Sequence, residues 1–180
     1  MRIIAGKHKG LVLNTFDADN IRPTIDRVRE NIFNKIQFDI SGSRVLDLFG
    51  GTGAVSLEFV SRGAGEVITV DNNINSLSLI EKNFQKAHQK PNLIKKDFQD
   101  ALLMLKGKKF NFIFLDPPFA SDYGQKSLEL IVKYGLLEEN GLIIYEHLVA
   151  SEFQVPENLT ICDSRKYGTI SVSFLRCNYD

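Results

Sequence analysis

The sequence predicts an α/β fold in which helices cover a mostly parallel sheet that ends in an antiparallel hairpin. Short runs rich in β-branched and aromatic residues alternate with longer amphipathic segments, and this alternation is typical of such sheets. Near the C-terminus two apolar runs follow one another with no helical segment between them, which indicates the hairpin. The length of 180 residues and the hydrophobic content of 43% suit one domain with a substantial core.

In the parallel part, a predicted helix stands before each predicted strand. The strands are expected at 44–49, 66–70, 92–95, 111–115 and 141–145. The helices are expected at 25–38, 54–62, 74–88, 98–105 and 125–134. Right-handed units of this kind leave the carboxyl ends of their strands along one edge of the sheet, where ligands bind.

Both ends of the chain are predicted to form hairpins. Residues 159–163 and 170–176 flank a turn at 165–168. Residues 2–5 and 10–14 are expected to form a small N-terminal β-hairpin extension that projects from the main sheet.

The net charge of zero conceals a basic N-terminal arm. Residues 1–35 hold seven Lys and Arg against four acids, which gives +3, whereas residues 36–180 hold 15 against 18, which gives −3. A basic arm on a mildly acidic body suggests that one end meets phosphate, although a solvated surface fits the charge equally well. Lys7, His8 and Lys9, at the exposed tip of the hairpin, are the best candidates for phosphate contact.

Several kinds of protein and site are not expected. The apolar core of the N-terminal segment is too short for a signal sequence, and no apolar run approaches membrane-spanning length. Cys162, Cys177 and three scattered histidines form neither a disulfide framework nor a metal-ligand pattern. We therefore expect a cytoplasmic monomer with no metal and no membrane contact.

A glycine-rich turn follows the first predicted strand, in Val45-Leu46-Asp47-Leu48-Phe49-Gly50-Gly51-Thr52-Gly53. Glycines let the backbone approach a ligand closely, and the next helix offers free N–H groups. The dinucleotide fingerprint would need Gly or Ala where Ser56 stands. Alternatively, the turn is only a tight link between strand and helix, with Asp47 capping that helix.

Three acids follow three successive strands. Asp71, eighteen residues past Gly53, can accept hydrogen bonds from both hydroxyls of a ribose. Asp47 would repel the pyrophosphate of NAD but attract the ammonium and sulfonium of S-adenosylmethionine. Asp97 can accept from an adenine amino group while Phe98 covers the ring. Each acid alone could serve a turn, but together they favour S-adenosylmethionine.

The apolar run before Asp116-Pro117-Pro118-Phe119 ends abruptly at the fourth strand end. Prolines fix their own φ and donate no backbone hydrogen bond, so the chain leaves the sheet in a stiff, extended conformation. The Asp116 carboxylate and the Pro117 carbonyl then form a pair of acceptors about one amino group wide, and Phe119 offers a stacking face. The alternative is a strand end with no chemistry attached.

Such a pair of acceptors suits an exocyclic amine of a nucleobase. The amine is a poor nucleophile because its lone pair is delocalised into the ring. Gripping both N–H bonds pulls the nitrogen toward a tetrahedral shape and restores the lone pair, which can attack a methyl sulfonium in line. The base must be unpaired or swung out of its stack to enter.

Motifs spread over nearly the whole chain resemble the RsmD family, bacterial methyltransferases of the N2 amine of a guanine in small-subunit (16S) ribosomal RNA. The motifs are Arg2-Ile3-Ile4-Ala5-Gly6-Lys7, Arg22-Pro23-Thr24, Asp26-Arg27-Val28-Arg29-Glu30, Val45-Leu46-Asp47-Leu48-Phe49, Gly51-Thr52-Gly53, Leu115-Asp116-Pro117-Pro118-Phe119 and Lys166-Tyr167-Gly168. The Asp-Pro-Pro-aromatic motif is shared with adenine N6 and glutamine N5 methyltransferases, so the N-terminal motifs make the match specific.

The resemblance implies a class I S-adenosylmethionine-dependent methyltransferase fold, which is Rossmann-like, with a seven-stranded sheet. It implies one domain over 1–180, with a basic hairpin at 1–20, a helix that covers the cofactor at 21–40 and a catalytic core at 41–180. The partner would be small-subunit ribosomal RNA or the assembling small subunit.

The motifs and the resemblance together give three sets of expected site residues. The catalytic set is Asp116, Pro117, Pro118 and Phe119. The cofactor-binding set is Arg22, Thr24, Asp47, Phe49, Gly51, Gly53, Asp71, Asn72, Asp97 and Phe98. The RNA-binding set is Arg2, Lys7, His8, Lys9, Arg27 and Arg29, although charge pairing within the helix fits the last two equally well.

Three alternatives stay open. The same chemistry could act on adenine N6 or on a protein glutamine, because the catalytic motif recognises an amine and not the ring behind it. An NAD-dependent dehydrogenase would have no use for the Asp-Pro-Pro corner. A non-enzymatic RNA-binding module would leave the glycine turn unexplained.

Overall fold

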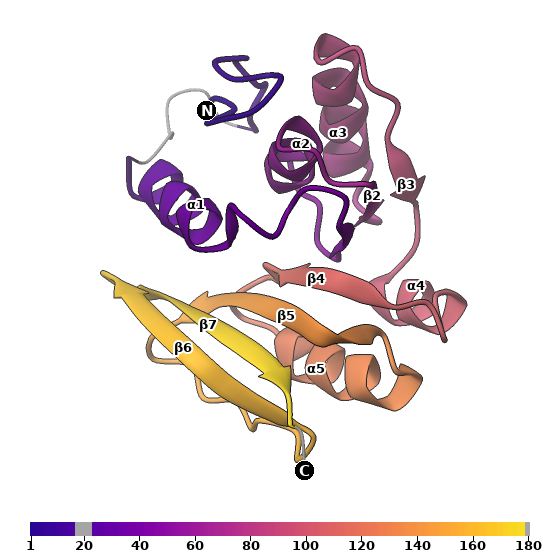
Figure 1. Ribbon diagram of the computed structural model, residues 1–180, viewed down its shortest axis with the longest axis vertical. Helices are drawn as coiled ribbons and strands as arrows, with labels where there is room; N and C mark the ends of the chain where they lie inside the picture. The colour runs from indigo at the N-terminus through magenta and orange to yellow at the C-terminus, as the bar shows by residue number, and fades with distance from the viewer. Residues whose placement is uncertain (17–22, 179–180) are drawn as a thin grey trace.

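The computed structural model describes residues 1–16 and 23–178. The helices of this part are α1 (Pro23–Ile36), α2 (Ala54–Ser61), α3 (Ile74–Lys86), α4 (Phe98–Met104) and α5 (Tyr123–Tyr134). The strands are β1 (Arg44–Asp47), β2 (Glu66–Val70), β3 (Asn92–Ile94), β4 (Phe110–Leu115), β5 (Leu137–Leu148), β6 (Leu159–Tyr167) and β7 (Ile170–Cys177). They form one sheet in the order β3-β2-β1-β4-β5-β7-β6. Strands β1 to β5 are parallel and β7 is antiparallel to both neighbours, which confirms the predicted fold class (Figure 1).

Helices cover both faces of the sheet (Figure 1). On one face α1 and α2 bury an apolar cluster that includes Val28, Ile32, Phe33, Phe59, Phe112, Phe114, Ile144, Val172 and Phe174. On the other face α4 and α5 bury a second cluster that includes Phe98, Leu102, Leu128, Ile131, Leu46, Ile113, Leu115 and Ile143. The central strands alternate between two buried faces, which is why their sequences are almost continuously hydrophobic.

Three strands differ from the sequence prediction by more than one residue. β1 ends at Asp47 rather than at 49. β5 is longer than 141–145, because its first residue pairs with Phe110 of β4 around a register shift. β6 continues to Tyr167, which pairs with Ile170, so the hairpin turn falls at residues 168–169 and not at 165–168. Gly168 has a φ of 63°, which a two-residue hairpin turn favours.

The N-terminal segment does not project from the molecule, contrary to the sequence prediction. It doubles back through one antiparallel bridge between Arg2 and Val12. Ile3 and Leu13 are buried against apolar side chains of α2 and α3. Burial of two such side chains contributes about 1.5–3 kcal/mol each, so the segment docks on these helices.

A buried glutamate reinforces this docking. Glu58 of α2 is fully buried, and its carboxylate accepts hydrogen bonds from the backbone N–H of Ile4 at 2.8 Å and of Ala5 at 3.2 Å. Arg62 donates to the same carboxylate at 3.0 Å. One turn further along α2, the Ser61 carbonyl accepts from the Lys7 N–H at 2.8 Å. The basic tip is therefore held on the end of α2.

Candidate active site

The carboxyl ends of the parallel strands open into one cavity of about 1020 Å³. Residues that follow β1 to β4 line it, together with α1, one residue of β5 and the β6–β7 turn. In Figure 1, β4 and β5 point toward the side on which that turn lies. The predicted site residues that line the cavity are Asp47, Phe49, Gly51, Asp71, Asn72, Asp97, Phe98, Asp116, Pro117, Pro118 and Phe119.

The glycine turn brings backbone to the edge of this cavity. Gly51 and Gly53 have φ values of 60° and 83°, in the left-handed region that favours glycine. A Cβ on Gly51 would meet no protein atom within 4 Å, so this backbone borders space that a ligand can fill. Gly53 does not line the cavity; it is the residue before α2, and its left-handed backbone shapes the turn.

Asp47 is buried at the end of β1, with 1% of its surface exposed. Its Oδ2 accepts from the Ser56 hydroxyl at 2.7 Å, while its Oδ1 is without a partner among the described residues. Burial raises the pKa of Asp47 to about 7; the charges of Asp116 and Asp71 add to the rise, and the Ser56 hydrogen bond opposes it. Asp47 does not cap α2, and the departure from the dinucleotide fingerprint at Ser56 supplies its hydrogen-bond donor.

Asp71, at the end of β2, is tied to the glycine turn. Its Oδ2 accepts from the Gly51 N–H and its Oδ1 from the Asn73 N–H, both at 2.9 Å. Each carboxylate oxygen keeps a further lone pair for a ligand hydroxyl. Asn72 is exposed beside it on the cavity.

An aromatic cluster lies beside the third acid. Asp97 accepts from the Gln99 N–H at 2.9 Å, so it caps α4 as well as lining the cavity. The ring centroid of Phe98 lies 5.4 Å from that of Phe49 and 4.8 Å from that of Tyr123. Sequence reasoning missed Tyr123, which α5 brings to the cavity. The cluster offers an apolar surface for a planar ring.

The corner after β4 keeps its predicted acceptors available. The Pro118 carbonyl accepts from the N–H of Ser121 at 3.2 Å and from its hydroxyl at 2.6 Å, which stiffens the corner. Within the described residues, no donor reaches the Pro117 carbonyl or the Asp116 carboxylate. Phe119 is 45% exposed on the cavity, as a stacking ring requires.

A second carboxylate, Glu146, stands beside this corner and was missed from the sequence. β5 pairs Tyr145 with Leu115, so Glu146 occupies the position next to Asp116. Burial raises the pKa of Glu146 to about 7, and burial together with the Glu146 charge raises the pKa of Asp116 well above its ordinary value. Asp116 is accessible through the cavity, so water there makes the rise smaller than in a closed interior. A lone acid in the apolar run of β5 is the signal that could have revealed Glu146.

Arg29, predicted to contact RNA, is instead only 6% exposed and lines the cavity. One of its guanidinium nitrogens donates to the Arg2 carbonyl and pairs with Asp26 at 3.5 Å. Its Nε and Nη1 are buried without a partner in the part of the chain that the structure describes. Helical spacing places Arg29 with Ile25 and Ile32 on the cavity side of α1. The prediction that Arg29 lies on an RNA-binding surface is therefore wrong.

The other predicted RNA contacts lie away from this cavity. Arg2, Lys7, Lys9 and Arg27 are exposed. His8, with its two lysine neighbours, lines a separate cavity of about 410 Å³ to which Lys86 and His88 also contribute. Arg22 lies outside the described residues, and Thr24 lies in α1.

Two absences hold for residues 1–16 and 23–178. No group of three His, Cys, Asp or Glu side chains is placed to hold a metal ion. No helix is both long and apolar enough to cross a membrane.

Comparison with known proteins identifies the family. A family model described as Conserved hypothetical protein 95 matches residues 1–176. The Haemophilus influenzae protein named Ribosomal RNA small subunit methyltransferase D is 30% identical, over 95% of this chain and 91% of that one. The chain belongs to the RsmD family. YlbH of Bacillus subtilis is 33% identical over 98% of both chains.

Solved structures agree with membership of the RsmD family. YhhF from Escherichia coli has a TM-score of 0.88 and 28% identity, over 100% of this chain and 99% of that chain. SMU.776, solved in complex with SAH, has a TM-score of 0.69 and 22% identity, over 86% of this chain and 50% of that chain, a likeness of fold alone. As a member of the RsmD family with this fold, the chain is a methyltransferase.

Proposed function

We propose that this chain transfers the methyl group of S-adenosylmethionine to the exocyclic N2 amine of a guanine in small-subunit (16S) ribosomal RNA. The observation that carries the proposal is the meeting of two available acceptors, on Asp116 and Pro117, with three acids at neighbouring strand ends in one cavity. The name of the Haemophilus influenzae relative supports ribosomal RNA of the small subunit as the substrate.

The residues present fit S-adenosylmethionine. The unpartnered Oδ1 of Asp47 would attract a cationic group, and the open space at Gly51 would admit the ligand against backbone. Asp71 and Asp97 keep lone pairs for ribose hydroxyls and for the adenine amine, whose ring would lie on Phe49, Phe98 and Tyr123. When bound, this cofactor supplies a methyl group on positively charged sulfur. The SAH complex of a protein with the same fold supports the assignment.

Two acceptors at the corner activate the amine. Asp116 and the Pro117 carbonyl hold its two N–H bonds, so the lone pair leaves the ring and points toward the methyl group. On accepting the methyl group, the nitrogen would have to lose one proton, which the Asp116 carboxylate would take. Burial and the Glu146 charge raise the pKa of the Asp116 carboxylate, and a carboxylate with a raised pKa is a stronger base. Phe119 stacks on the base and holds it in line.

Nucleoside mass spectrometry tests the proposed substrate. Purified protein and S-adenosylmethionine are incubated with small ribosomal subunits from a bacterial strain that lacks its own RsmD-family gene. We expect one new N2-methylguanosine per RNA. N6-methyladenosine would support the adenine alternative, and methylation of ribosomal protein alone would support the glutamine alternative.

Arg29 is expected to bind the carboxylate of the cofactor's methionine portion through its two unpartnered nitrogens. Because hydrogen bonds to charged groups contribute about 1.5–3 kcal/mol, the Arg29→Met variant should bind S-adenosylmethionine about 10- to 100-fold more weakly by calorimetry. Methylthioadenosine, which lacks the carboxylate, should bind both proteins equally. Equal weakening for both ligands would leave Arg29 with a structural role only.

The exposed tip of the N-terminal segment is expected to contact RNA phosphates. The double variant Lys7→Glu with Lys9→Glu reverses two exposed charges, so it should weaken RNA binding by at least about 10-fold. The slope of log K against log salt concentration should fall by about the amount that two phosphate contacts contribute. Calorimetry with S-adenosylmethionine should show unchanged affinity. Equal loss of both affinities would contradict the separation of the two surfaces.

A further inference from the structure

We propose that Glu146 selects guanine, by accepting a hydrogen bond from the N1–H of the base while Asp116 and the Pro117 carbonyl hold the N2 amine. The inference rests on the proposed function and concerns which base the site accepts, not whether an amine is methylated.

Glu146 and Asp116 stand side by side at the ends of two paired strands. The parallel pair of Leu115 and Tyr145 sets Asp116, the residue after β4, beside Glu146 of β5. On its other side Glu146 pairs with Val172 of β7, which is fully buried. The two acids therefore lie on the face of the sheet that α1 covers, where α1 also lines the cavity.

Glu146 has no visible structural task. It is half-buried on the face of β5 that also carries the apolar residues Leu142 and Ile144, and it lines the same cavity as Asp116 to Phe119. Among the residues whose side chains the structure describes (1–16 and 25–178), none forms an ion pair with its carboxylate and no donor reaches it. A partly buried, unpaired carboxylate is costly unless a donor arrives with a ligand.

The Watson–Crick edges of the two candidate bases differ at the atom beside the amine. Guanine presents N1–H, a donor, next to its N2 amine. Adenine presents N1 as an acceptor next to its N6 amine. A flipped base is recognised by hydrogen bonds to this edge, so two adjacent acceptor side chains complement guanine. Against adenine, the Glu146 carboxylate would face a lone pair, which is a repulsive element.

Electrostatics act in the same direction. The pKa of both carboxyls is raised by burial, and the two charges repel one another. Donors on guanine would stabilise both charged forms, whereas the N1 lone pair of adenine would destabilise the one on Glu146. The same pair of acids therefore holds one base and rejects the other.

The test compares guanosine with 2-aminopurine riboside at the methylated position of a synthetic ribosomal RNA fragment. 2-Aminopurine keeps the N2 amine but has an acceptor at N1. Wild-type protein should prefer guanosine in kcat/KM by about 100-fold or more, since a hydrogen-bonding site rejects an analogue that lacks the bond. Glu146→Gln can donate its amide to that N1, so the preference should fall at least about 10-fold, while affinity for S-adenosylmethionine stays within about 2-fold.

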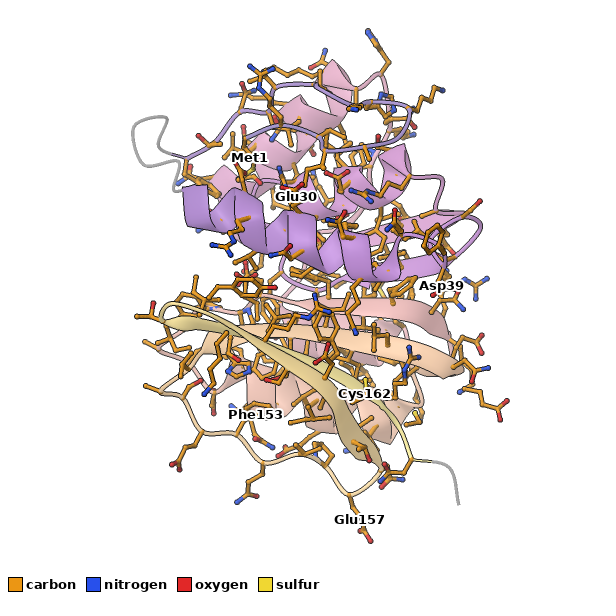
Figure 2. The ribbon with its side chains drawn as sticks, turned by 60° about the vertical axis from the view of Figure 1, so that its left-hand side comes forward. Met1, Glu30, Asp39, Phe153, Glu157 and Cys162 are labelled. Carbon is orange, nitrogen blue, oxygen red and sulfur yellow. The ribbon has the colours of Figure 1, made fainter. Side chains whose placement is uncertain are left out.

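Glu157→Gln provides the matched control. Glu157 is exposed in the loop before β6, at the opposite end of the molecule from Met1, which lines the cavity (Figure 2). This variant should keep the wild-type preference. If Glu146→Gln turns over too slowly, equilibrium binding of the same RNAs with S-adenosylhomocysteine present gives the ratio. An unchanged ratio overturns the inference alone, whereas a wild-type protein that methylates no guanine overturns the proposed function.

Discussion

Replacing Asp116 by alanine is expected to slow methyl transfer by roughly 10²–10³-fold, the loss typical of removing one group that is aimed at the reacting atoms. The variant would leave the amine held by the Pro117 carbonyl alone, and its lone pair would stay in the ring. Single-turnover kinetics with small-subunit RNA measures the step directly. Cofactor affinity should change by only a few-fold, because in the proposed mechanism the corner would contact the base and not the adenosine.

Asp39→Ala is the control for this variant. Asp39 is exposed beyond the end of α1, away from Met1 and the cavity (Figure 2), and its loss should leave the rate unchanged. A normal rate for Asp116→Ala would show that the amine is not gripped at this corner.

Replacing Asp47 by asparagine is expected to stabilise the protein at alkaline pH in the absence of ligand. Burial raises the pKa of Asp47 to about 7 in the folded state, so folding favours the protonated acid. Its stabilising contribution is complete below about pH 4 and is lost as the pH rises through about 7. A shift of about three units corresponds to about 4 kcal/mol at most. The free energy of unfolding is measured with urea at about pH 5.5 and at about pH 8. Between these two pH values, wild-type protein should lose about 2 kcal/mol more of it than Asp47→Asn.

The same substitution should have the opposite effect on cofactor binding. A neutral amide gives a cationic ligand less attraction, so affinity for S-adenosylmethionine should fall by about 10- to 100-fold. Asp100 is exposed in the first turn of α4. Asp100→Asn should change neither the pH dependence of stability nor the affinity for S-adenosylmethionine. An identical pH dependence of stability in Asp47→Asn and wild-type protein would contradict a buried carboxylate with a raised pKa at this position.

Much of the fold and part of the candidate site could be predicted from local sequence. Parallel strands bring their carboxyl ends to one edge, so polar residues such as Asp71 that follow successive apolar runs converge whatever the exact boundaries. The rigidity of Pro117 and Pro118 is likewise local, because it depends only on the pyrrolidine ring. These features need no knowledge of distant contacts.

The features that were missed depend on contacts between distant segments. A charged side chain such as that of Arg29 predicts a surface position, and only the packing of α1 over the cavity turns it inward. Glu146 acquires its significance from the register of β5 beside β4, which the sequence does not fix. The docking of the N-terminal segment requires Glu58, whose partners lie more than fifty residues earlier in the chain.

The anchoring of that segment bears on how a large substrate can be engaged. α2 is a helix of eight residues, about 12 Å long. The glycine turn precedes its first residue, and its last residue, Ser61, accepts hydrogen bonds from the backbone N–H groups of Lys7 and His8 in the basic tip. Because the backbone of the tip is already held by Ser61, a polyanion that met it would have to order only side chains, so less conformational entropy would be lost on association. The two turns of α2 thus fix the distance between the basic tip and the glycine turn that borders the cavity.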